Sequence, residues 1–445
     1  MARSQRKRHT NPDFRHRVPV PLPPVEEIEQ QLWRLLSPSL VAPRLMERRD
    51  PRQGERRIRM RARVLTLPVM VALIVSLVWR RLGAVAEVRR VLAQEGLLWG
   101  EPLEVSEQAI SKRLDTLPAA VMGEVFAEVS SRLQAQPTPS WPGGEDWKAV
   151  RARFPLLACV DGSTLEALRK KTQAVREVSG LVLAGRMMVL VEAFGHRPLW
   201  QCYTDDAAAN DKRFTAEILD AVPLGGVLIF DLGFFSFLWF DTFTDEQKYF
   251  VTRLRQKTAY KTVRGLSQGP YYRDEIIQLG QYRSNPCRHQ LRFVSVLWQG
   301  QWYRYLTNVL APAHLSARQV CELYRRRWRI EDAFLLTKRV LDLAYLWTAS
   351  ANGVQLQIYA TLIFYAVRLT LCHQVAQALS EPLDRISVEM VFRALSHFSR
   401  AVQRGETETL VDFLAAHAAL LGLVKRQRKR DRERLQQDQL VWGGS

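Results

Sequence analysis

The chain has 445 residues, with 64 Lys+Arg against 45 Asp+Glu and a formal net charge of +19. This length predicts about three domains, and 47% hydrophobic residues are enough to bury a core, which excludes a wholly disordered chain. A sequence pI of about 10.1 is unusual for a metabolic enzyme and favours a polyanionic partner, with nucleic acid ahead of an anionic membrane.

The excess positive charge is concentrated at the two ends of the chain. Residues 1–63 contain 16 Lys+Arg and 7 Asp+Glu, and residues 425–434 contain 7 basic and 2 acidic residues. A solvated tail is the ordinary interpretation of a single basic run. Two basic ends on either side of a folded middle favour nucleic acid, so residues 1–63 are predicted to form a basic N-terminal arm that contacts it.

An uncharged run follows the arm. Residues 64–79, VLTLPVMVALIVSLVW, contain no charged side chain, but 16 residues fall short of the roughly 20 that span a bilayer. We therefore expect a buried helix rather than a membrane span, and no membrane partner. The N-terminus is basic and then Pro-rich, without the apolar run of a signal peptide.

The cysteines are odd in number and widely spaced, and no CxxC pair occurs: Cys159, Cys202, Cys287, Cys321 and Cys372. This usage argues against a disulfide framework and against a zinc ribbon. A reducing, cytoplasmic compartment is the simplest expectation.

Residues 64–135 are predicted to be helical and are a candidate DNA-binding region. Ser106 precedes a segment with helical apolar spacing that resembles the second helix of a helix-turn-helix motif. In that interpretation Lys112 and Arg113 would be exposed toward DNA. A plain helical hairpin is at least as consistent with the same pattern.

A linker is predicted at residues 136–147, because the stretch 135–146 contains three prolines and two glycines. Beyond it, strands are predicted at 154–161, 186–194, 198–205, 225–231 and 248–255, with a helix at 211–222. Three hairpin-connected strands followed by strand–helix alternation predict an α/β fold, a mixed five-stranded sheet flanked by helices.

The later part of the chain changes texture twice. Residues 256–309 are rich in Tyr, Thr, Arg, Gln and Gly and alternate in polarity, which predicts a β-strand insertion. From about Ser316 the pattern is helical. The predicted organisation is therefore a first core part at 148–255, the insertion at 256–309, a core helix region at 310–350, and a helical C-terminal region at 351–445 that is a candidate for dimerisation.

Two acids close apolar strands in the predicted sheet. Asp161 lies in CVDGS and Asp231 in IFDLGFF. An acid at the end of a buried strand lies at the edge of the sheet where α/β folds bind ligands. Each alone could be a turn-forming or capping residue. The two together are harder to dismiss, because adjacent carboxylates repel unless a cation or a proton lies between them.

The segment 321–343 is predicted to be a helix that places four chemical groups on one face. With about 100° per residue, Tyr324, Arg327, Glu331 and Lys338 fall within about 60° of arc. A separate apolar stripe would be buried; it consists of Leu323, Ile330, Phe334 and Leu341. A solvated charged face is the ordinary alternative. A single carboxylate in a basic row suits a metal ligand beside phosphate-binding groups.

Three carboxylates together suit metal-dependent phosphoryl transfer. Mg²⁺ prefers oxygen ligands and keeps several waters. Two such ions about 4 Å apart activate a water or a 3′-hydroxyl and stabilise the leaving oxygen. Carboxylates would hold the ions, while arginine, lysine and tyrosine would hold the strand.

The spacing of Tyr324, Arg327, Glu331 and Lys338 is a Y-R-E-K signature. With it, residues 150–345 resemble bacterial DDE transposases of the insertion-sequence-four family. Asp161-Gly162-Ser163 is similar to the first acidic block of that family, and Asp231 with the four residues after it is similar to the second. The insertion before Glu331 also matches.

The resemblance implies an RNase H-like fold and a role for each matching residue. Asp161, Asp231 and Glu331 would bind two Mg²⁺ ions, with Mn²⁺ as a substitute. Phosphate or base contacts would come from these side chains: Tyr324, Arg327, Lys338, Arg253, Trp328, Trp298 and Trp302. The partners would be transposon-end and target DNA, bound by a homodimer in a synaptic complex that associates with the nucleoid.

The resemblance also implies a reaction course. Water nicks one strand at the transposon end, the freed 3′-hydroxyl attacks the other strand to form a hairpin, and the reopened ends attack target DNA. Two alternatives are a domesticated relative that binds DNA without cutting it and a stand-alone RNase H-like nuclease. All three acids are present, which argues against simple inactivation, and the basic ends favour synapsis over plain hydrolysis.

Overall fold

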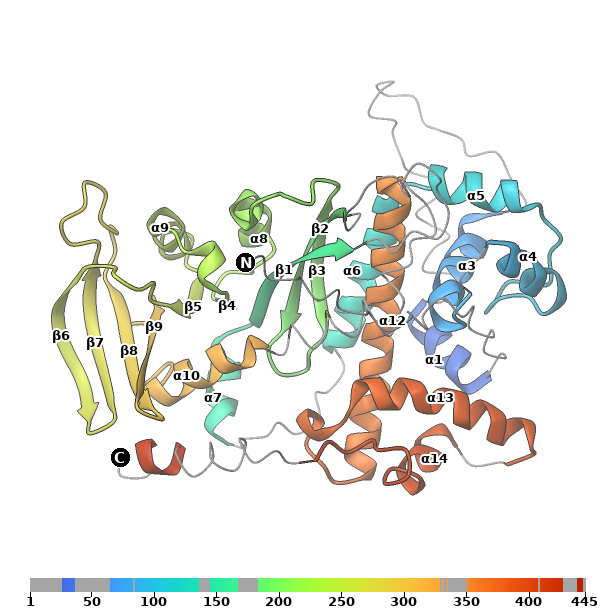
Figure 1. Cartoon of the computed structure of the whole chain (residues 1–445). Helices are drawn as coiled ribbons and strands as arrows, with labels where there is room; N and C mark the ends of the chain where they lie inside the picture. The colour runs from blue at the N-terminus through green and yellow to red at the C-terminus, as the bar shows by residue number, and fades with distance from the viewer. Residues whose placement is uncertain are drawn as a thin grey trace, which may run out of the picture.

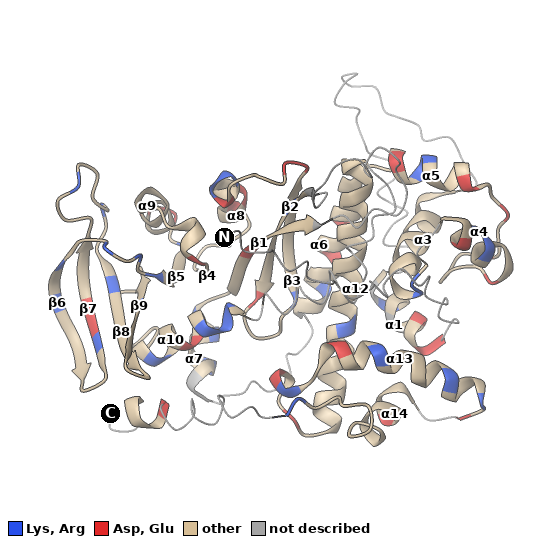
Figure 2. Cartoon of the chain, in the orientation of Figure 1, with Lys and Arg blue, Asp and Glu red and all other residues tan. Residues whose placement is uncertain are grey.

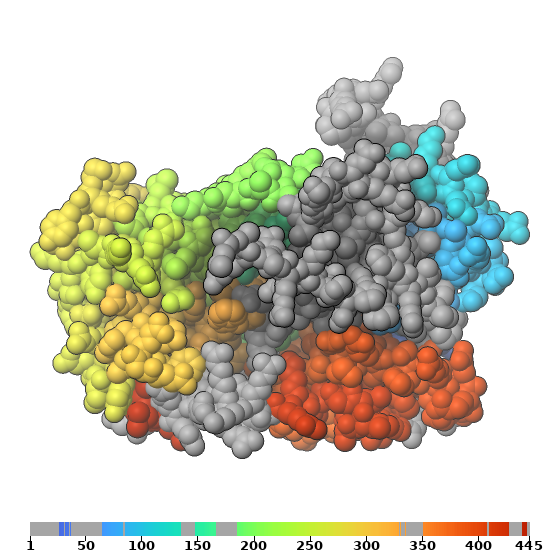
Figure 3. All heavy atoms as spheres, viewed as in Figure 1, coloured from blue at the N-terminus to red at the C-terminus, as the bar shows by residue number. Residues whose placement is uncertain are grey.

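The computed structural model describes residues 26–36, 65–82, 85–135, 145–166, 183–328, 330, 334, 350–406, 409–426 and 438–442. Figure 1 shows an outer group of strands, a central group of strands, and a group of helices drawn from both halves of the chain. The space-filling view in Figure 3 has the outer strands (yellow) at one end of the visible face and the helices of residues 383–426 (orange and red) toward the other.

One sheet of nine strands runs through the first two groups, in the order β3-β2-β1-β4-β5-β9-β8-β7-β6. The strands are β1 Leu157–Glu166, β2 Leu183–Glu192, β3 Pro198–Thr204, β4 Val227–Ile229, β5 Tyr249–Arg253, β6 Tyr260–Gly269, β7 Tyr272–Leu279, β8 Leu291–Trp298 and β9 Gln301–Thr307. β4 pairs in parallel with both β1 and β5, and every other pairing is antiparallel. The sheet is therefore mixed, as predicted.

The sheet is larger than the five strands predicted. The five expected strands occupy the positions β3 to β5, but β5 does not end the sheet, because Val251 pairs with Thr307 of β9 and Arg253 with Tyr305. Unpaired backbone donors and acceptors at a sheet edge are unfavourable. Strand β9 of the insertion pairs with those of β5. The insertion is thus a continuation of the core sheet and not a separate β unit.

Alternation along the central strands buries both faces of the sheet. On β1, Ala158 and Val160 join a cluster with the aromatic side chains that follow β4, while Leu157 and Cys159 join the larger cluster beneath the helices. The first face is covered by the 3₁₀ helix η4 (Asp211–Phe214), α8 (Thr215–Asp220) and α9 (Phe237–Asp245). By the same alternation Asp161 lies on the face of Cys159.

The helical part is built around α12 (Ala351–Ala378), which packs against α3 (Leu67–Trp79), α6 (Ala119–Ala135), α13 (Val388–Gln403) and α14 (Leu410–Ala416). The uncharged run forms α3 as predicted, and all but two of its residues are buried. α12 is the one described helix long and apolar enough to cross a membrane, and 83% of its most apolar window is buried inside the protein. That burial is typical of the central helix of a globular core.

The predicted N-terminal arm contains a folded helix. α1 (Glu26–Leu36) buries Leu32 and Leu36 completely and packs on α6 and α12. The Glu27 carboxylate accepts hydrogen bonds of 2.9 Å from the backbone amide of Leu410, which ties α1 to the start of α14. The arm interpretation is therefore wrong for this acidic, apolar stretch; residues 1–25 and 37–63 lie outside the described residues.

The helical pair proposed as a DNA reader is present. α4 (Val85–Gln94) packs on α5 (Glu107–Thr116), and the Ser106 hydroxyl caps α5 by accepting from the amide of Ala109 at 3.2 Å. Lys112 is exposed, but Arg113 is 7% exposed, so its predicted exposure is wrong.

One predicted boundary, the C-terminal end of the linker at 136–147, differs in the structure. α7 (Glu145–Arg153) begins inside the predicted linker, and residues 136–144 lie outside the described residues. Most of the C-terminal basic run, residues 427–434, also lies outside them. Residues 438–442 return to the sheet, where the Trp442 ring lies 4.9 Å from that of Tyr272.

Candidate active site

The two predicted acids meet at one edge of the sheet. β1 and β4 are parallel, with Cys159 opposite Ile229. Asp161 and Asp231 each follow those residues by two positions, so the register brings them to neighbouring places. Asp231 lies just past the end of β4, but Asp161 lies within β1, which continues to Glu166, so the prediction that Asp161 closes its strand is wrong. Asp231 also accepts a hydrogen bond of 2.8 Å from the amide of Gly233, which caps the 3₁₀ helix η5 (Leu232–Phe234).

Asp161 is a largely buried carboxylate with two donors. Nη1 of Arg327 donates to its Oδ2 at 2.9 Å, and the amide of Gly162 donates to its Oδ1 at 2.8 Å. Burial nevertheless raises the pKa of Asp161 to about 6; Arg327 opposes the rise, and the charges of Asp231 and Asp211 add to it. Burial and the two neighbouring carboxylates therefore disfavour the charged form of Asp161, and a cation bound beside it would relieve both.

The helix α10 (Ala317–Arg326) carries the next groups toward this edge. Ser316 starts it with a capping box in which Gln319 is the partner residue. Leu323 is fully buried in the predicted apolar stripe. The stripe continues past α10, since Ile330 and Phe334 are also buried, while Leu341 lies outside the described residues.

Tyr324 and Arg327 lie together at the end of α10. The Tyr324 ring is 5.2 Å from that of Tyr305, and the Arg327 guanidinium is 5.9 Å from the Tyr324 ring centre. Burial raises the pKa of the Tyr324 phenol, while the charges of Arg327 and Arg253 lower it. Both side chains are buried, at 6% and 7% exposed.

Of the other predicted site residues, the structure describes Trp328 and Arg253 but not Glu331 and Lys338. Trp328 is 59% exposed, and the guanidinium of Arg327 lies 5.2 Å from its ring centre. Arg253 is half-buried over the ring of Tyr303, at 6.0 Å. Glu331 and Lys338 lie outside the described residues, so the third acid of the predicted triad is not placed.

The insertion tryptophans differ from each other. Trp298 is half-buried and lies 5.7 Å from the ring of Tyr303, as expected for a packing residue. Trp302 is 39% exposed with Arg273 at 5.8 Å over its ring. In the cartoon of Figure 2, positions of Lys and Arg (blue) occur on these outer strands and on α10.

Lys112 and Arg113 are not brought to the site. Figure 1 shows α5 among the N-terminal helices, beyond α12 from the sheet.

Sequence reasoning missed an ion pair beside the two acids. Arg186 of β2 donates from Nε to Oδ1 of Asp211 at 2.8 Å, contacts the same oxygen through Nη2, and reaches the Thr164 hydroxyl at 3.2 Å. From the sequence, Asp211 is only the first residue of the helix predicted at 211–222. Nothing in the local pattern signalled the pair, because its two members are 25 residues apart and meet through strand pairing.

The donor chemistry of the site fits a hard divalent cation. Carboxylate oxygens are the ligands that Mg²⁺ prefers, and Asp161 and Asp231 offer them from two neighbouring strands. Among the described residues, no group of three or more His, Cys, Asp and Glu side chains is arranged to hold a metal ion.

Residues 152–367 match the family described as the transposase DDE domain. The matched region begins just before β1 and ends within α12, so it includes both aspartates and the segment of Tyr324 and Arg327. The match identifies residues 152–367 as a transposase DDE domain.

Two curated relatives are named as transposases. The chain is 25% identical over 300 residues to a putative transposase of Sinorhizobium fredii, covering 60% of this chain and 82% of the relative. It is 26% identical over 169 residues to the probable transposase for insertion sequence element IS5377 of Geobacillus stearothermophilus, covering 36% and 43%. The chain therefore spans most of the first relative and less than half of the second.

One solved structure has a weaker likeness to this chain. It is a piggyBac transposase synaptic complex with hairpin DNA, with a TM-score of 0.41 and 9% identity over 91% of this chain and 87% of that one. A score at this level does not by itself indicate a common fold.

Proposed function

We propose that the chain is a cut-and-paste transposase of the insertion-sequence-four type, with an RNase H-like core, that cleaves transposon ends and joins them to target DNA. The observation that supports this most is the edge formed by β1 and β4. Two carboxylates stand side by side there, and burial together with their mutual repulsion raises the pKa of Asp161 to about 6.

In this proposal Asp161, Asp231 and Glu331 hold two Mg²⁺ ions, for which Mn²⁺ can substitute. Bound ions would supply the activation of water or of a 3′-hydroxyl and the stabilisation of the leaving oxygen. The carboxylates would fix the positions of both reacting oxygens relative to the sheet edge.

Arg327 would have two partners in turn. Without a cation it pairs with Asp161, with Nη1 lying 2.9 Å from Oδ2. A cation on Asp161 would take over that neutralisation, and the guanidinium would become available to a phosphate of the transposon end. Tyr324, Lys338 and Arg253 would contact neighbouring phosphates. Trp328, exposed beside Arg327, would pack against the terminal bases, and Trp298 and Trp302 would hold a displaced base.

The complete reaction would be a nick, a hairpin, reopening and strand transfer. Two ends must be cut in one complex, so we propose a homodimer that assembles on double-stranded DNA in the cytoplasm, at the nucleoid. Lys112 on α5 would contribute to backbone contacts, and the basic ends of the chain would supply salt-dependent affinity.

The decisive experiment is a joining assay with purified protein, Mg²⁺, element-end DNA and a target plasmid. Joined products support the transposase proposal, whereas degradation without joining would indicate a stand-alone nuclease. Glu331→Gln should leave end binding near normal and abolish cleavage. A Glu331→Gln protein that still cuts would remove Glu331 from the proposed triad, and a wild-type protein that binds ends without cutting would indicate a domesticated DNA-binding relative.

A further inference from the structure

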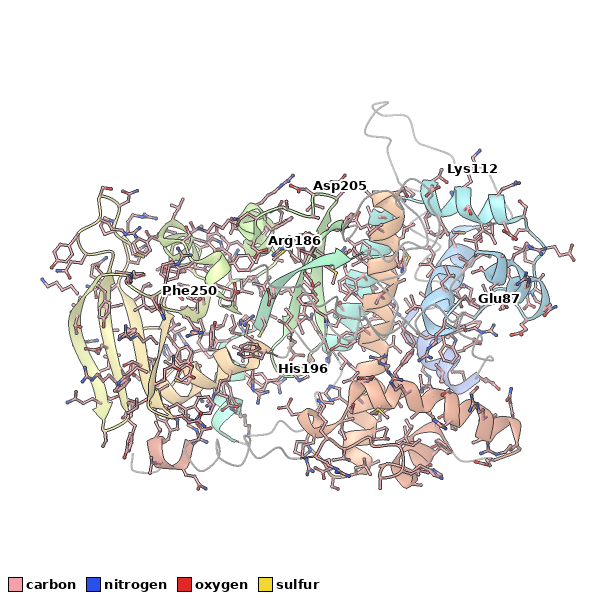
Figure 4. All side chains as sticks on the ribbon, in the orientation of Figure 1. Glu87, Lys112, Arg186, His196, Asp205 and Phe250 are labelled. Carbon is pink, nitrogen blue, oxygen red and sulfur yellow. The ribbon has the colours of Figure 1, made fainter. Side chains whose placement is uncertain are left out.

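The Arg186–Asp211 pair lies beside both acidic blocks, although neither residue belongs to the DDE motif. Arg186 comes from β2 and Asp211 from η4, on separate parts of the core. Their side chains are 21% and 18% exposed, so the pair is substantially screened from solvent. Figure 4 labels Arg186 in the central part of the sheet, with Asp205 beyond the end of β3 and His196 at the turn that follows β2.

The Asp211 carboxylate fits between two glycines, one from each block. A methyl group added to Gly162 would lie 2.7 Å from Oδ1 of Asp211, and one added to Gly233 would lie 3.1 Å from its Oδ2. Gly162 directly follows Asp161, and Gly233 is two residues after Asp231. The carboxylate can approach both blocks because neither position has a side chain, and it places one oxygen against each.

The two oxygens of Asp211 have different surroundings. Both contacts from Arg186 go to Oδ1. Oδ2 is the oxygen nearer Gly233 and the Asp231 loop. Within the described part of the chain, no donor forms a hydrogen bond to it. An ionised carboxylate oxygen has lone pairs to offer and favours a donor. Arg186 therefore fixes the orientation of a carboxylate whose second oxygen remains able to accept.

We propose that Asp211 is a positioning residue of the metal site, held by Arg186 so that its Oδ2 accepts a hydrogen bond from water bound to a divalent cation at Asp161 and Asp231. This inference rests on the proposed function, since it presupposes a cation there. Mg²⁺ and Mn²⁺ keep waters that need such acceptors. Outer carboxylates of this kind typically change metal affinity by about 10- to 100-fold. Arg186 also neutralises Asp211, which allows a third carboxylate beside two others.

The test is Mn²⁺ binding to the full-length protein without DNA, measured from the electron paramagnetic resonance signal of free Mn²⁺. Asp211→Asn keeps the shape of the side chain and an acceptor for Arg186 but removes the charge. It should weaken Mn²⁺ binding about tenfold. Asp205→Asn, an exposed acid beyond the end of β3, is the matched control and should bind Mn²⁺ like the wild type.

Thermal unfolding of the metal-free variants separates positioning from mere structural support. A structural role alone would lower the melting temperature of Asp211→Asn and leave the Mn²⁺ affinity of the folded protein unchanged, and that result would overturn the inference. Asp161→Asn is the reference arm. If Asp161→Asn weakens Mn²⁺ binding and Asp211→Asn does not, only the role of Asp211 fails; if Asp161→Asn has no effect, the proposed metal site fails with it.

Discussion

Two Asp–Arg pairs of the sheet differ in how the arginine bonds the carboxylate. Between β7 and β8, Arg292 donates from Nε and Nη2 to the two oxygens of Asp274 at 2.7 and 2.6 Å, and from Nη1 to the carbonyl of Leu315 at 2.5 Å. Both side chains are at most 1% exposed. At the β1–β4 edge, Arg327 reaches only one oxygen of Asp161, beside two further carboxylates.

The bidentate Arg292–Asp274 pair joins β7 to β8, and the carbonyl of Leu315 accepts from the remaining nitrogen of Arg292. At Asp161 the arginine bonds one oxygen, and burial together with the charges of Asp231 and Asp211 raises the pKa of the carboxyl. We therefore propose a structural role for the first pair and a cation-binding role for the carboxylate of the second.

The largest expected effect is on catalysis at the β1–β4 edge. Asp161→Asn should lower Mg²⁺-dependent end cleavage by about 10³-fold or more, because several kcal/mol of charge stabilisation depend on the ion that Asp161 holds. Cleavage is measured on labelled element ends, and binding by gel shift should stay near normal. Asp206→Asn, an exposed acid 3.7 Å from Arg213, is the control. Wild-type cleavage by Asp161→Asn would exclude Asp161 from the site.

The next effect is on stability at the structural pair. Asp274→Ala leaves the buried Arg292 without its counter-charge and should destabilise the protein by about 3–5 kcal/mol, measured by urea unfolding. The double variant Arg292→Met with Asp274→Leu removes both charges and should cost much less. If Asp274→Ala were as stable as the wild type, the contrast between the two pairs would be lost.

A smaller effect is the pH dependence of the metal-free protein. The folded-state pKa of Asp161 is raised from 3.8 to about 6, so between these values the folded state binds more protons than the unfolded state. The contribution of Asp161 to stability should therefore fall as pH rises from about 4 to 6, by up to about 3 kcal/mol. Unfolding curves of the wild type and of Asp161→Asn should converge at low pH and separate above pH 6, with the variant more stable. Parallel curves would contradict the assignment.

The smallest effect concerns Arg327. Its charge opposes the rise in the pKa of Asp161, so Arg327→Gln should raise that pKa further. The acidic limb of the pH–cleavage profile should then move to higher pH, while Arg326→Gln, whose guanidinium lies 3.9 Å from the centre of the Phe194 ring, should leave the limb in place. An unmoved limb in Arg327→Gln would show that Asp161 does not control it.

The sequence was most informative where local pattern decides structure. The apolar runs before Asp161 and Asp231 predicted β1 and β4, although β1 continues past the acid to Glu166, and parallel pairing brings Asp161 and Asp231 to neighbouring positions. Arg113 shows where the pattern was misjudged. It lies three residues after the buried Ile110 and next to the buried Leu114, so helical geometry already placed it on the inward face of α5.

Other features depend on contacts that no local pattern records. Asp211 meets Arg186 only after β2 and β3 have paired and the chain has turned into η4. The single sheet of nine strands likewise depends on Val251 finding Thr307, 56 positions along the chain. The local pattern predicted the strands on both sides, but not the pairing that joins them.

The central claim, that Asp161 and Asp231 share a divalent cation, can be tested by replacing Mg²⁺ with Fe²⁺ and mapping where oxidant-generated radicals cut the protein's own backbone. Cuts should cluster next to residues 161 and 231, fade with excess Mg²⁺, and disappear in Asp161→Asn. Cuts elsewhere in the chain, or cuts at these positions that Mg²⁺ does not suppress, would contradict the account.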